Sequence, residues 1–217
     1  MIFEDWGIIN YADAVQRQHE CFEHVIHNKL AGIATIDVVN FCEHPSVITI
    51  GRHGKESNLL VDSACLKSHG IDYYHTDRGG DITFHGLGQQ VVYPILDLQH
   101  FGLGIKKYVN ILEQCVIDLL SIYGISACRV SGASGVWLDS GTDRERKICA
   151  IGVRASHYIT MHGIGLNVNT DLSYFSFINP CGFMDKGVTS MERELNHKID
   201  MEDVKDNLRA IFTQKFS

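Results

Sequence analysis

Cys181 has the setting of a nucleophile in this 217-residue sequence. It stands between Pro180 and Gly182 in a loop, where a side chain is presented at a rigid turn. A nucleophilic cysteine needs a neighbouring histidine or lysine that favours the thiolate over the thiol. From the residues alone, two interpretations of Cys181 stay open, an activated thiol or another inert one.

Lys147 is the candidate for that neighbour. It opens the otherwise apolar run Lys-Ile-Cys-Ala-Ile-Gly, residues 147–152, of a predicted strand. A lysine near a thiol would favour the thiolate by electrostatic attraction. The alternative is a lysine at the end of a strand that points into water, as most lysines do.

A glycine-rich stretch from Arg78 to Gln89 forms the second candidate site. Glycine permits positive φ and lets another molecule lie directly against the backbone, because it has no Cβ. Thr83 and His85 alternate with Ile82 and Phe84, so we expect the polar pair on one face of a strand and the apolar pair on the other. The alternative is a pair of tight turns around a hairpin that binds nothing.

The six other cysteines have settings that suggest no chemistry. Five of them lie in or beside predicted helices and strands, where a small buried hydrophobe is the usual role: Cys21, Cys42, Cys115, Cys128 and Cys149. Cys65 lies in a short polar helix with no activating neighbour expected. An odd total of seven without Cys-x-x-Cys spacing predicts reduced thiols and a cytoplasmic protein.

Composition and missing motifs exclude several classes of function. The twelve histidines form no His-Glu-x-x-His motif and no zinc quartet with cysteine, so we expect no metal. The segment Gly51 to Lys55 departs from the phosphate-binding Walker pattern. A net charge of −7 without a long basic block argues against nucleic acid. No apolar run reaches the ~18 residues of a membrane span, and the N-terminus lacks a secretory signal.

Helical periodicity predicts the elements that would position these residues. Helices are expected over Asp13 to Leu30, Ser63 to Ser68, Ile105 to Tyr123 and from Met201, with a helical turn near Asp171 to Phe177. The first should bury Val15, Phe22, Ile26 and Leu30, and the last Val204, Leu208, Ile211 and Phe212.

Alternating and β-branched runs predict strands on both sides of the helix that begins at Ile105. They are Ile33 to Val39, Val47 to Ile50, His75 to Asp77, Val91 to Tyr93, Ile125 to Val130, Gly135 to Leu138, Lys147 to Ala155 and Tyr158 to Val168. Strands grouped together with a few flanking helices indicate an α+β protein, and the length suits a single domain over residues 1–217.

Five motifs in a fixed order resemble the lipoyl(octanoyl) transferase family. They begin with Glu43-His-Pro-Ser-Val-Ile-Thr-Ile-Gly-Arg and the stretch from Arg78, which Tyr93-Pro-Ile-Leu-Asp-Leu follows. Lys147-Ile-Cys-Ala-Ile-Gly-Val-Arg, His162-Gly-Ile-Gly-Leu-Asn-Val and Asn179-Pro-Cys-Gly complete the series. The resemblance extends from about Tyr11 to Leu195.

The resemblance implies a cytoplasmic acyltransferase that needs no cofactor. Such an enzyme moves an octanoyl group from acyl carrier protein to a lysine of a lipoyl domain, the first step of protein lipoylation. The acceptors would be E2 subunits of 2-oxoacid dehydrogenases and the glycine cleavage H protein. The implied fold is a mixed β-sheet flanked by helices with a small second sheet, similar to biotin and lipoate protein ligases.

The resemblance also implies roles for individual residues. Cys181 would form the acyl-thioester and Lys147 would be its catalytic partner. The implied substrate-binding residues are Arg78, Gly79, Gly80, Asp81, Ile82, Thr83, Phe84, His85, Ala150, Ile151, Gly152, Gly163, Ile164 and Gly165. Leu87 departs from the family pattern, which usually has proline at this position. A proline would fix φ in the turn after His85.

Two other functions remain alternatives to this transferase. An ATP-dependent lipoate-protein ligase shares the expected fold but forms an acyl-adenylate and needs no cysteine nucleophile. A non-catalytic homologue would only bind a carrier protein. For docking of an acidic carrier protein, we expect a local basic patch, with Arg144, Arg146, Lys106 and Lys107 as candidates; the alternative is a solvated surface.

Overall fold

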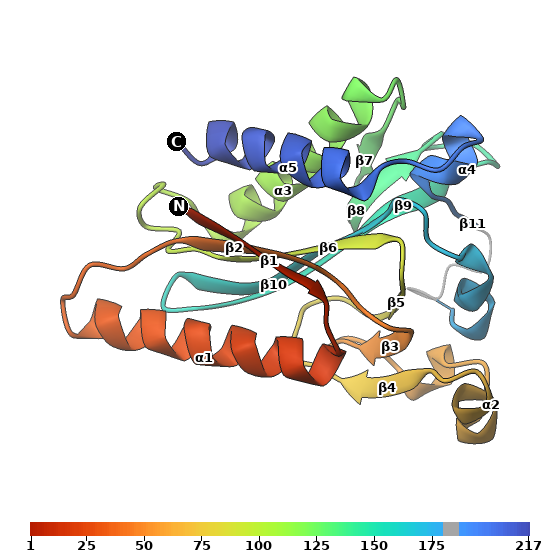
Figure 1. Cartoon of the computed structure of the whole chain (residues 1–217), viewed down its shortest axis with the longest axis horizontal. Helices are drawn as coiled ribbons and strands as arrows, with labels where there is room; N and C mark the ends of the chain where they lie inside the picture. The colour runs from red at the N-terminus through yellow and green to blue at the C-terminus, as the bar shows by residue number, and fades with distance from the viewer. Residues whose placement is uncertain (180–186) are drawn as a thin grey trace.

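Two β-sheets form the centre of the protein in a computed structural model that describes residues 1–179 and 187–217 (Figure 1). The larger sheet contains, in spatial order, β1 (Ile2–Ile8), β2 (Val38–Glu43), β6 (Gln89–Ile95), β10 (Ile159–Asn167), β9 (Arg146–Ser156), β8 (Ala133–Leu138) and β7 (Cys128–Val130). The short β11 (Gly187–Val188) pairs in parallel with β9. The small sheet has the order β4 (Asp72–His75), β3 (Val47–Ile50), β5 (Ile82–His85).

Helices cover both faces of the larger sheet. Helix α1 (Tyr11–Leu30) lies along one face, and α3 (Ile105–Ile122) and α5 (Met201–Lys215) pack together on the other (Figure 1). The shorter helical segments are α2 (Ser63–Ser68), α4 (Met191–Leu195), η1 (Glu56–Asn58) and η2 (Leu172–Phe177). None of the helices within the described ranges is long and apolar enough to span a membrane. The expected α+β fold with a small second sheet is confirmed.

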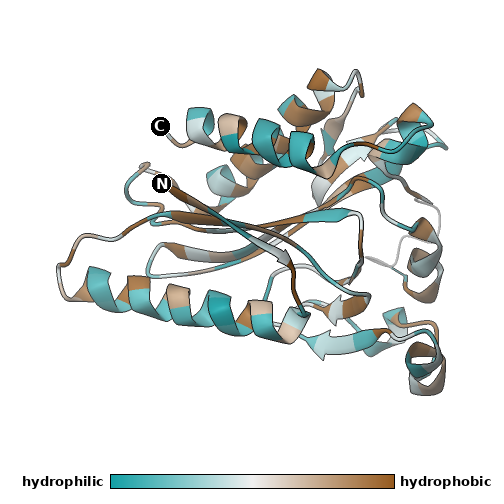
Figure 2. Ribbon diagram, viewed as in Figure 1, coloured by the Kyte–Doolittle hydropathy of each residue, from teal (hydrophilic) through white to brown (hydrophobic). Residues whose placement is uncertain are grey.

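Hydrophobic residues concentrate in the central strands and recur along the helices on either side, as the hydropathy colouring of Figure 2 shows. The main core joins the strands to α3 and α5, and its α5 contribution is the predicted set of Val204, Leu208, Ile211 and Phe212. Burying each such side chain contributes about 1.5–3 kcal/mol. A separate core fills the space beneath the small sheet, between its strands, α2 and η2.

The predicted apolar face of α1 is rotated in the structure. Phe22 and Ile26 are buried as expected, but Val15 is only half-buried and Leu30 is 68% exposed. The buried face includes Gln18, whose amide oxygen accepts a hydrogen bond from the backbone N–H of His162 at 3.0 Å. A polar residue was therefore part of the inward stripe, and an apolar periodicity could not identify it.

Several predicted strand boundaries were wrong. The strand expected over Ile33 to Val39 begins only at Val38, and the preceding residues 33–37 form no regular structure. There Asp37 accepts a hydrogen bond from the backbone N–H of Asp97 at 2.7 Å. The strand expected over Ile125 to Val130 is shortened to β7, and the one expected over His75 to Asp77 lies earlier, as β4. Strand β1, not predicted, pairs in parallel with β2 at the sheet edge.

Gly163 on β10 provides a test of how closely the central strands pack. A Cβ on Gly163 would overlap the carbonyl oxygen of Val92 on the neighbouring strand β6. We expect Gly163→Ala to lower the free energy of unfolding by about 1–3 kcal/mol, because backbone atoms would have to shift. In the control Gly187→Ala, the new methyl group meets its nearest neighbour at 3.5 Å and should change stability little. Equal urea midpoints for both variants would contradict this account of the strand contact.

Candidate active site

A pocket opens where the small sheet meets β9 and β10 of the larger sheet. Its empty space, about 780 Å³, includes open solvent at the mouth. Twelve of the fourteen predicted substrate-binding residues line it: Arg78, Gly80, Asp81, Ile82, Thr83, His85, Ala150, Ile151, Gly152, Gly163, Ile164 and Gly165. Segments about 70 residues apart in the sequence thus form one site, and Lys147 lies in its wall with them.

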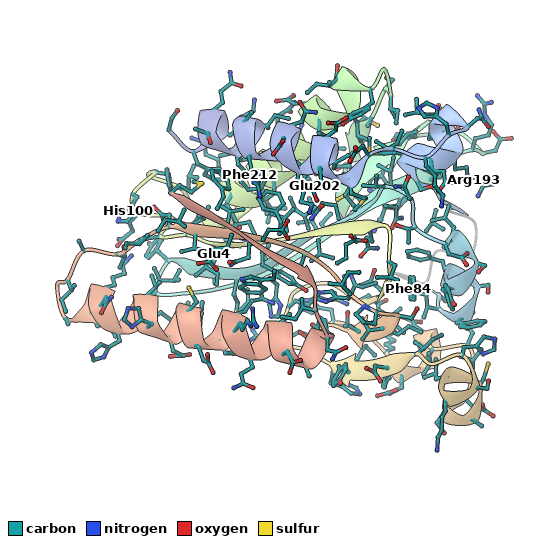
Figure 3. The ribbon with its side chains drawn as sticks, in the orientation of Figure 1. Glu4, Phe84, His100, Arg193, Glu202 and Phe212 are labelled. Carbon is teal, nitrogen blue, oxygen red and sulfur yellow. The ribbon has the colours of Figure 1, made fainter. Side chains whose placement is uncertain are left out.

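Two of the predicted binding residues do not line the pocket. Phe84 points into the core of the small sheet, where its ring stacks on Tyr174 with centroids 4.9 Å apart (Figure 3). Gly79 is used for backbone pairing, because its N–H donates to the carbonyl of Val153 at 2.9 Å. The expected alternation in β5 accounts for Phe84, which lies between Thr83 and His85, but Ile82 at the start of the strand also lines the pocket.

Backbone and ionic contacts fix the loop that carries Arg78. Its preceding residue, Asp77, accepts a hydrogen bond from His162 Nε2 at 2.7 Å and pairs with Arg154. The hydrogen bond from His162 is the largest influence that lowers the pKa of Asp77, to about 2. Burial, opposed by the contact with Asp77, lowers the pKa of His162. The loop is thereby held against the β9–β10 hairpin, which contributes the opposite wall.

Arg78 was expected to bind substrate, and its guanidinium also has structural partners. Its Nη2 donates to the backbone carbonyl of Thr49 at 2.8 Å and to the hydroxyl of Thr49 at 2.9 Å. Its Nη1 donates to the carbonyl of Gly79 at 3.1 Å. Arg78 is 8% exposed. These bonds tie the glycine loop to the small sheet, whichever further contacts the side chain makes.

Lys147 does not point into open water. Its ammonium lies 4.5 Å from the centroid of the Trp137 ring, on the neighbouring strand β8. On its other side, β11 runs parallel to β9 and places Val188 opposite Lys147. The backbone N–H of Thr189 then donates to the carbonyl of Lys147 at 2.9 Å. The cation is thus held over an aromatic face at the pocket wall, a favourable cation–π arrangement.

Cys181 lies outside the described residues, but the chain on both sides of it is placed. Before it, the backbone N–H of Asn179 donates to the carbonyl of Asn58 at 2.7 Å. After it, the N–H of Gly187 donates to the carbonyl of Glu145 at 3.1 Å, and Val188 lines the pocket. The segment that contains Cys181 therefore joins two points, of which the second lies beside Lys147.

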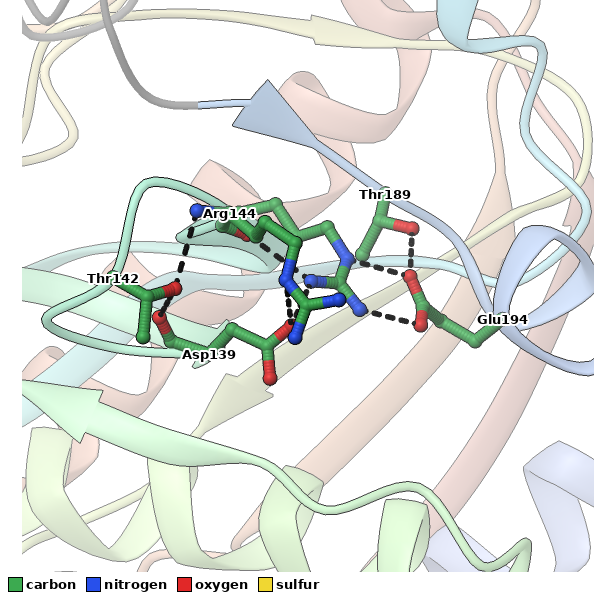
Figure 4. A network of polar contacts seen from close by, with 6 residues as sticks. Asp139, Thr142, Arg144, Thr189 and Glu194 are labelled. Carbon is green, nitrogen blue, oxygen red and sulfur yellow. Dashed lines mark hydrogen bonds and ion pairs between the residues drawn. The ribbon is translucent and has the colours of Figure 1, made fainter.

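Arg146, beside Lys147, is held by acidic groups and is not the exposed cation expected for carrier-protein docking. It donates to Glu194 through Nε and Nη2, both at 2.7 Å, and to Asp139 at 2.6 Å (Figure 4). These contacts raise the pKa of Arg146 above its usual value, the bond with Glu194 most. Glu194 also accepts a hydrogen bond from the hydroxyl of Thr189. The network links the β8–β9 turn to the segment after β11.

Six residues that line the pocket were missed by the sequence analysis: Gln89, Tyr93, Ser134, Asn167, Phe175 and Val188. Gln89 and Asn167 are buried amides in strands that are otherwise largely apolar, and that contrast was the available signal. Gln89 Oε1 lies 2.6 Å from His85 Nδ1, and Gln89 Nε2 donates to Asn167 Oδ1 at 2.8 Å. Polar residues at buried strand positions therefore mark the pocket floor.

The described cysteines are largely in the inert settings that the sequence predicted. Burial raises the pKa of Cys42, Cys115 and Cys149 most strongly, and that of Cys21 as well. Two of them have a histidine neighbour: His44 Nε2 lies 3.7 Å from the sulfur of Cys42, and His69 Nδ1 lies 3.8 Å from that of Cys65, one helical turn away. The sequence did not predict the histidine beside Cys65, and this contact does not by itself show that the thiol is activated. Across the residues described, no three His, Cys, Asp or Glu side chains gather as they would around a metal ion.

Comparison with known proteins relates this chain to lipoyl protein ligases and octanoyltransferases. The sequence model described as "Lipoyl protein ligase A/B catalytic domain" matches residues 10–213. An octanoyltransferase of Bacteroides fragilis is 56% identical over 207 residues, which are 95% of this chain and 94% of the relative. An octanoyltransferase of Bacteroides thetaiotaomicron is 55% identical over 209 residues, 96% of this chain and 92% of the relative.

Solved structures of ligases have a similar fold. A bipartite lipoate protein ligase from Thermoplasma acidophilum, studied with its E2 lipoyl domain, aligns with a TM-score of 0.71 at 18% identity, covering 98% of this chain and 82% of that chain. A lipoate-protein ligase A bound with ATP aligns with a TM-score of 0.70 at 15% identity, over 99% of this chain and 84% of that chain. At such low identity these two structures show the fold alone, and they confirm the expected ligase-like architecture.

Arg144 and Arg146 allow a matched test of the network in Figure 4. Arg146→Glu would place a carboxylate beside Glu194 and Asp139, so we expect it to lower the free energy of unfolding by about 1–3 kcal/mol. Arg144→Glu makes the same charge change two residues earlier, but the Arg144 side chain is 78% exposed and should contribute little. Thermal unfolding of both variants would measure the difference. A smaller loss in Arg146→Glu than in Arg144→Glu would refute the role given to this network.

Proposed function

This chain belongs to the lipoyl protein ligase A/B catalytic domain family, and we propose that it transfers an octanoyl group to lysine side chains of lipoyl domains. The observation that carries this proposal is the identity of more than half the residues with an octanoyltransferase across nearly the whole chain. Acyl carrier protein is the proposed donor. The proposed acceptors are 2-oxoacid dehydrogenase E2 subunits and the glycine cleavage H protein, and the cytoplasm remains the predicted location.

The pocket suits an apolar acyl chain with a polar end. Ile82, Ile151, Ile164, Phe175 and Val188 contribute apolar surface, while His85, Asn167 and Lys147 supply polar groups. Each methylene of an octanoyl chain that leaves water contributes about 0.8 kcal/mol to binding. Mostly apolar walls with a few converging polar groups are typical of small-molecule sites.

In the proposed mechanism, the Cys181 thiolate attacks the thioester carbonyl of the donor and the carrier thiolate leaves. A lysine amine of the lipoyl domain then attacks the acyl-enzyme, which forms the amide and releases Cys181. Lys147 supports both steps: as a cation it favours the thiolate, and as a neutral amine it can take a proton from the incoming lysine. A thioester is already activated, so neither step consumes a nucleotide.

The ligase fold leaves an ATP-dependent reaction as the second candidate function, since a structural neighbour was bound with ATP. The two functions differ in the covalent state of the protein. A cysteine acyltransferase given donor but no acceptor accumulates an acyl-enzyme, whereas a ligase stays unmodified and requires free acid with ATP. A protein that only binds a carrier protein would do neither.

Intact-mass measurement of the acyl-enzyme tests this proposal. With octanoyl-acyl carrier protein alone, we expect one octanoyl group on the protein, at Cys181, released by hydroxylamine and discharged by a lipoyl domain. Cys181→Ser should abolish rapid transfer, because a hydroxyl ionises far less readily than a thiol. Cys65→Ser is the matched control, since it removes a half-buried cysteine whose sulfur lies 3.8 Å from His69 Nδ1. Full transfer by Cys181→Ser would rule out the mechanism.

The electrostatic role of Lys147 has a separate test. Lys147→Met keeps an unbranched side chain over Trp137 but removes the charge. We expect alkylation of Cys181 by iodoacetamide to require a higher pH in this variant, since no cation favours the thiolate. Peptide mass analysis follows the reaction, and Cys65 serves as an internal reference whose rate should not change. If the two Cys181 profiles coincide, Lys147 is not the activating group.

A further inference from the structure

Hydrogen bonds across the pocket floor determine which nitrogen of His85 carries a proton. At one end of this series of hydrogen bonds, Asn167 Nδ2 donates to the backbone carbonyl of Thr189 at 3.0 Å. Gln89 Nε2 donates to the backbone carbonyl of Phe84 at 3.1 Å and to Asn167 Oδ1. Carbonyl oxygens only accept, so these two contacts fix the orientation of both side-chain amides. The oxygen of Gln89, not its nitrogen, therefore faces His85.

The orientation of Gln89 dictates the tautomer of His85. Because Gln89 Oε1 only accepts, His85 Nδ1 must carry the hydrogen in the 2.6 Å contact between them. In a neutral ring the other nitrogen, Nε2, is then an acceptor with its lone pair available. The ring is neutral because burial, with the nearby His44 and Arg78, lowers the pKa of His85 to about 3. Stacking on Tyr11, with centroids 6.2 Å apart, holds the ring plane.

His85 lines the pocket, and Gln89 occupies its Nδ1, which leaves the second ring nitrogen, Nε2. Within residues 1–179 and 187–217, Nε2 has no hydrogen-bond partner, and it is not fully buried. The neighbouring His44 differs, although its ring centroid is only 6.0 Å away. His44 Nδ1 donates to the carbonyl of Ile9 at 2.8 Å, and the hydroxyl of Tyr93 donates to its Nε2 at 2.7 Å. Of this pair, only His85 offers an acceptor to a ligand.

We propose that His85 is a further catalytic residue, whose Nε2 accepts a hydrogen bond from the attacking lysine amine of the lipoyl domain. This inference rests on the proposed transfer to lysine. A neutral acceptor such as His85 Nε2 needs an N–H donor. The thioester has no N–H at its reacting carbonyl, so the donor at the reaction centre is the incoming amine. By holding one N–H, His85 aims the lone pair of the amine at the carbonyl carbon.

The chemical step needs no lasting protonation of His85. The amine nitrogen bonds to the carbonyl carbon, the C–S bond of the acyl-enzyme breaks, and one amine proton ends on the released thiol. While the nitrogen gains positive charge in the tetrahedral adduct, its hydrogen bond to His85 becomes charge-assisted and stronger. A ring that stays neutral keeps its lone pair for this bond throughout the physiological pH range. The first half-reaction, thiolate attack on the donor, does not use this bond.

Nitrogen NMR tests the structural basis of the proposal without any activity measurement. Long-range ¹H–¹⁵N correlation spectra distinguish the Nδ1–H tautomer, the Nε2–H tautomer and the doubly protonated ring. The resonances of His85 are those that disappear in His85→Phe or in His85→Asn. We expect the Nδ1–H tautomer at pH 7, with no protonation down to about pH 5. Observation of the Nε2–H tautomer, or of a charged ring at pH 7, would overturn the proposal.

Single-turnover kinetics test the role of the acceptor. His85→Phe retains an aromatic ring beside Tyr11 but removes both nitrogens. We expect acylation by octanoyl-acyl carrier protein within about 3-fold of the native rate, and discharge to a lipoyl domain slowed by about 10- to 100-fold. His44→Phe is the matched control: it removes a second buried histidine of the same cluster, so it should lower stability while its folded fraction discharges at nearly the native rate.

The outcomes separate this inference from the proposed function. Equal losses in both half-reactions, native discharge by His85→Phe, or an equal defect in folded His44→Phe would each refute the specific role of His85. If the native protein forms no acyl-enzyme, the proposed function fails, whereas the tautomer measured by NMR stands or falls independently. If neither His85 variant folds, pH-dependent spectra of the native protein with His44→Phe as the assignment reference still decide the tautomer.

Discussion

Direct contact between backbones, with no side chains between them, is the constraint on which the pocket depends. The loop at Gly79 and Gly80 is enclosed on two sides: a Cβ on Gly152 of β9 would lie 2.7 Å from the carbonyl oxygen of Gly79, and one on Gly51 would lie 2.5 Å from that of Gly80. Such approaches are available only to glycine. The pairing of Asp77 with His162 then fixes the loop laterally. Together these contacts bring two separate sheets close enough to share a site.

That constraint changes the meaning of the glycine motifs. From the sequence, we interpreted the glycines as openings against which a ligand could lie. In the structure, the backbone of the protein itself occupies the space beside Gly79, Gly152 and Gly163. Gly165 comes closest to the original interpretation, because its nearest neighbours are the pocket side chains of Gln89 and His85. The glycines are therefore needed mainly because they allow the backbone contacts that form the pocket, and any contact they make with substrate is additional.

The parts of the site that were predictable are those encoded within a short segment. Alternation in β5 placed Thr83 and His85 on the pocket face, and the apolar strand after Lys147 located the opposite wall. The contact between Gln89 and Asn167 joins residues 78 positions apart, so no local pattern could reveal it. The partners of Arg146 were hidden for the same reason, since Glu194 is 48 positions away. Local patterns thus predicted which side chains face inward but not what they meet there.

Long-range hydrogen bonds also connect the two walls of the pocket. The series that begins at His85 passes through Gln89 and Asn167 to the backbone of Thr189, whose N–H donates to the carbonyl of Lys147. The spacing between a neutral acceptor and a cation is therefore set by short amide side chains and strand backbone, which have little freedom when buried. A thioester needs no further activation, so for the proposed transfer accurate placement of these two groups is the main contribution that the protein must make. In the proposed transfer, the polar series, and not a nucleotide, would position the reacting groups, although the fold is shared with a ligase that was bound with ATP.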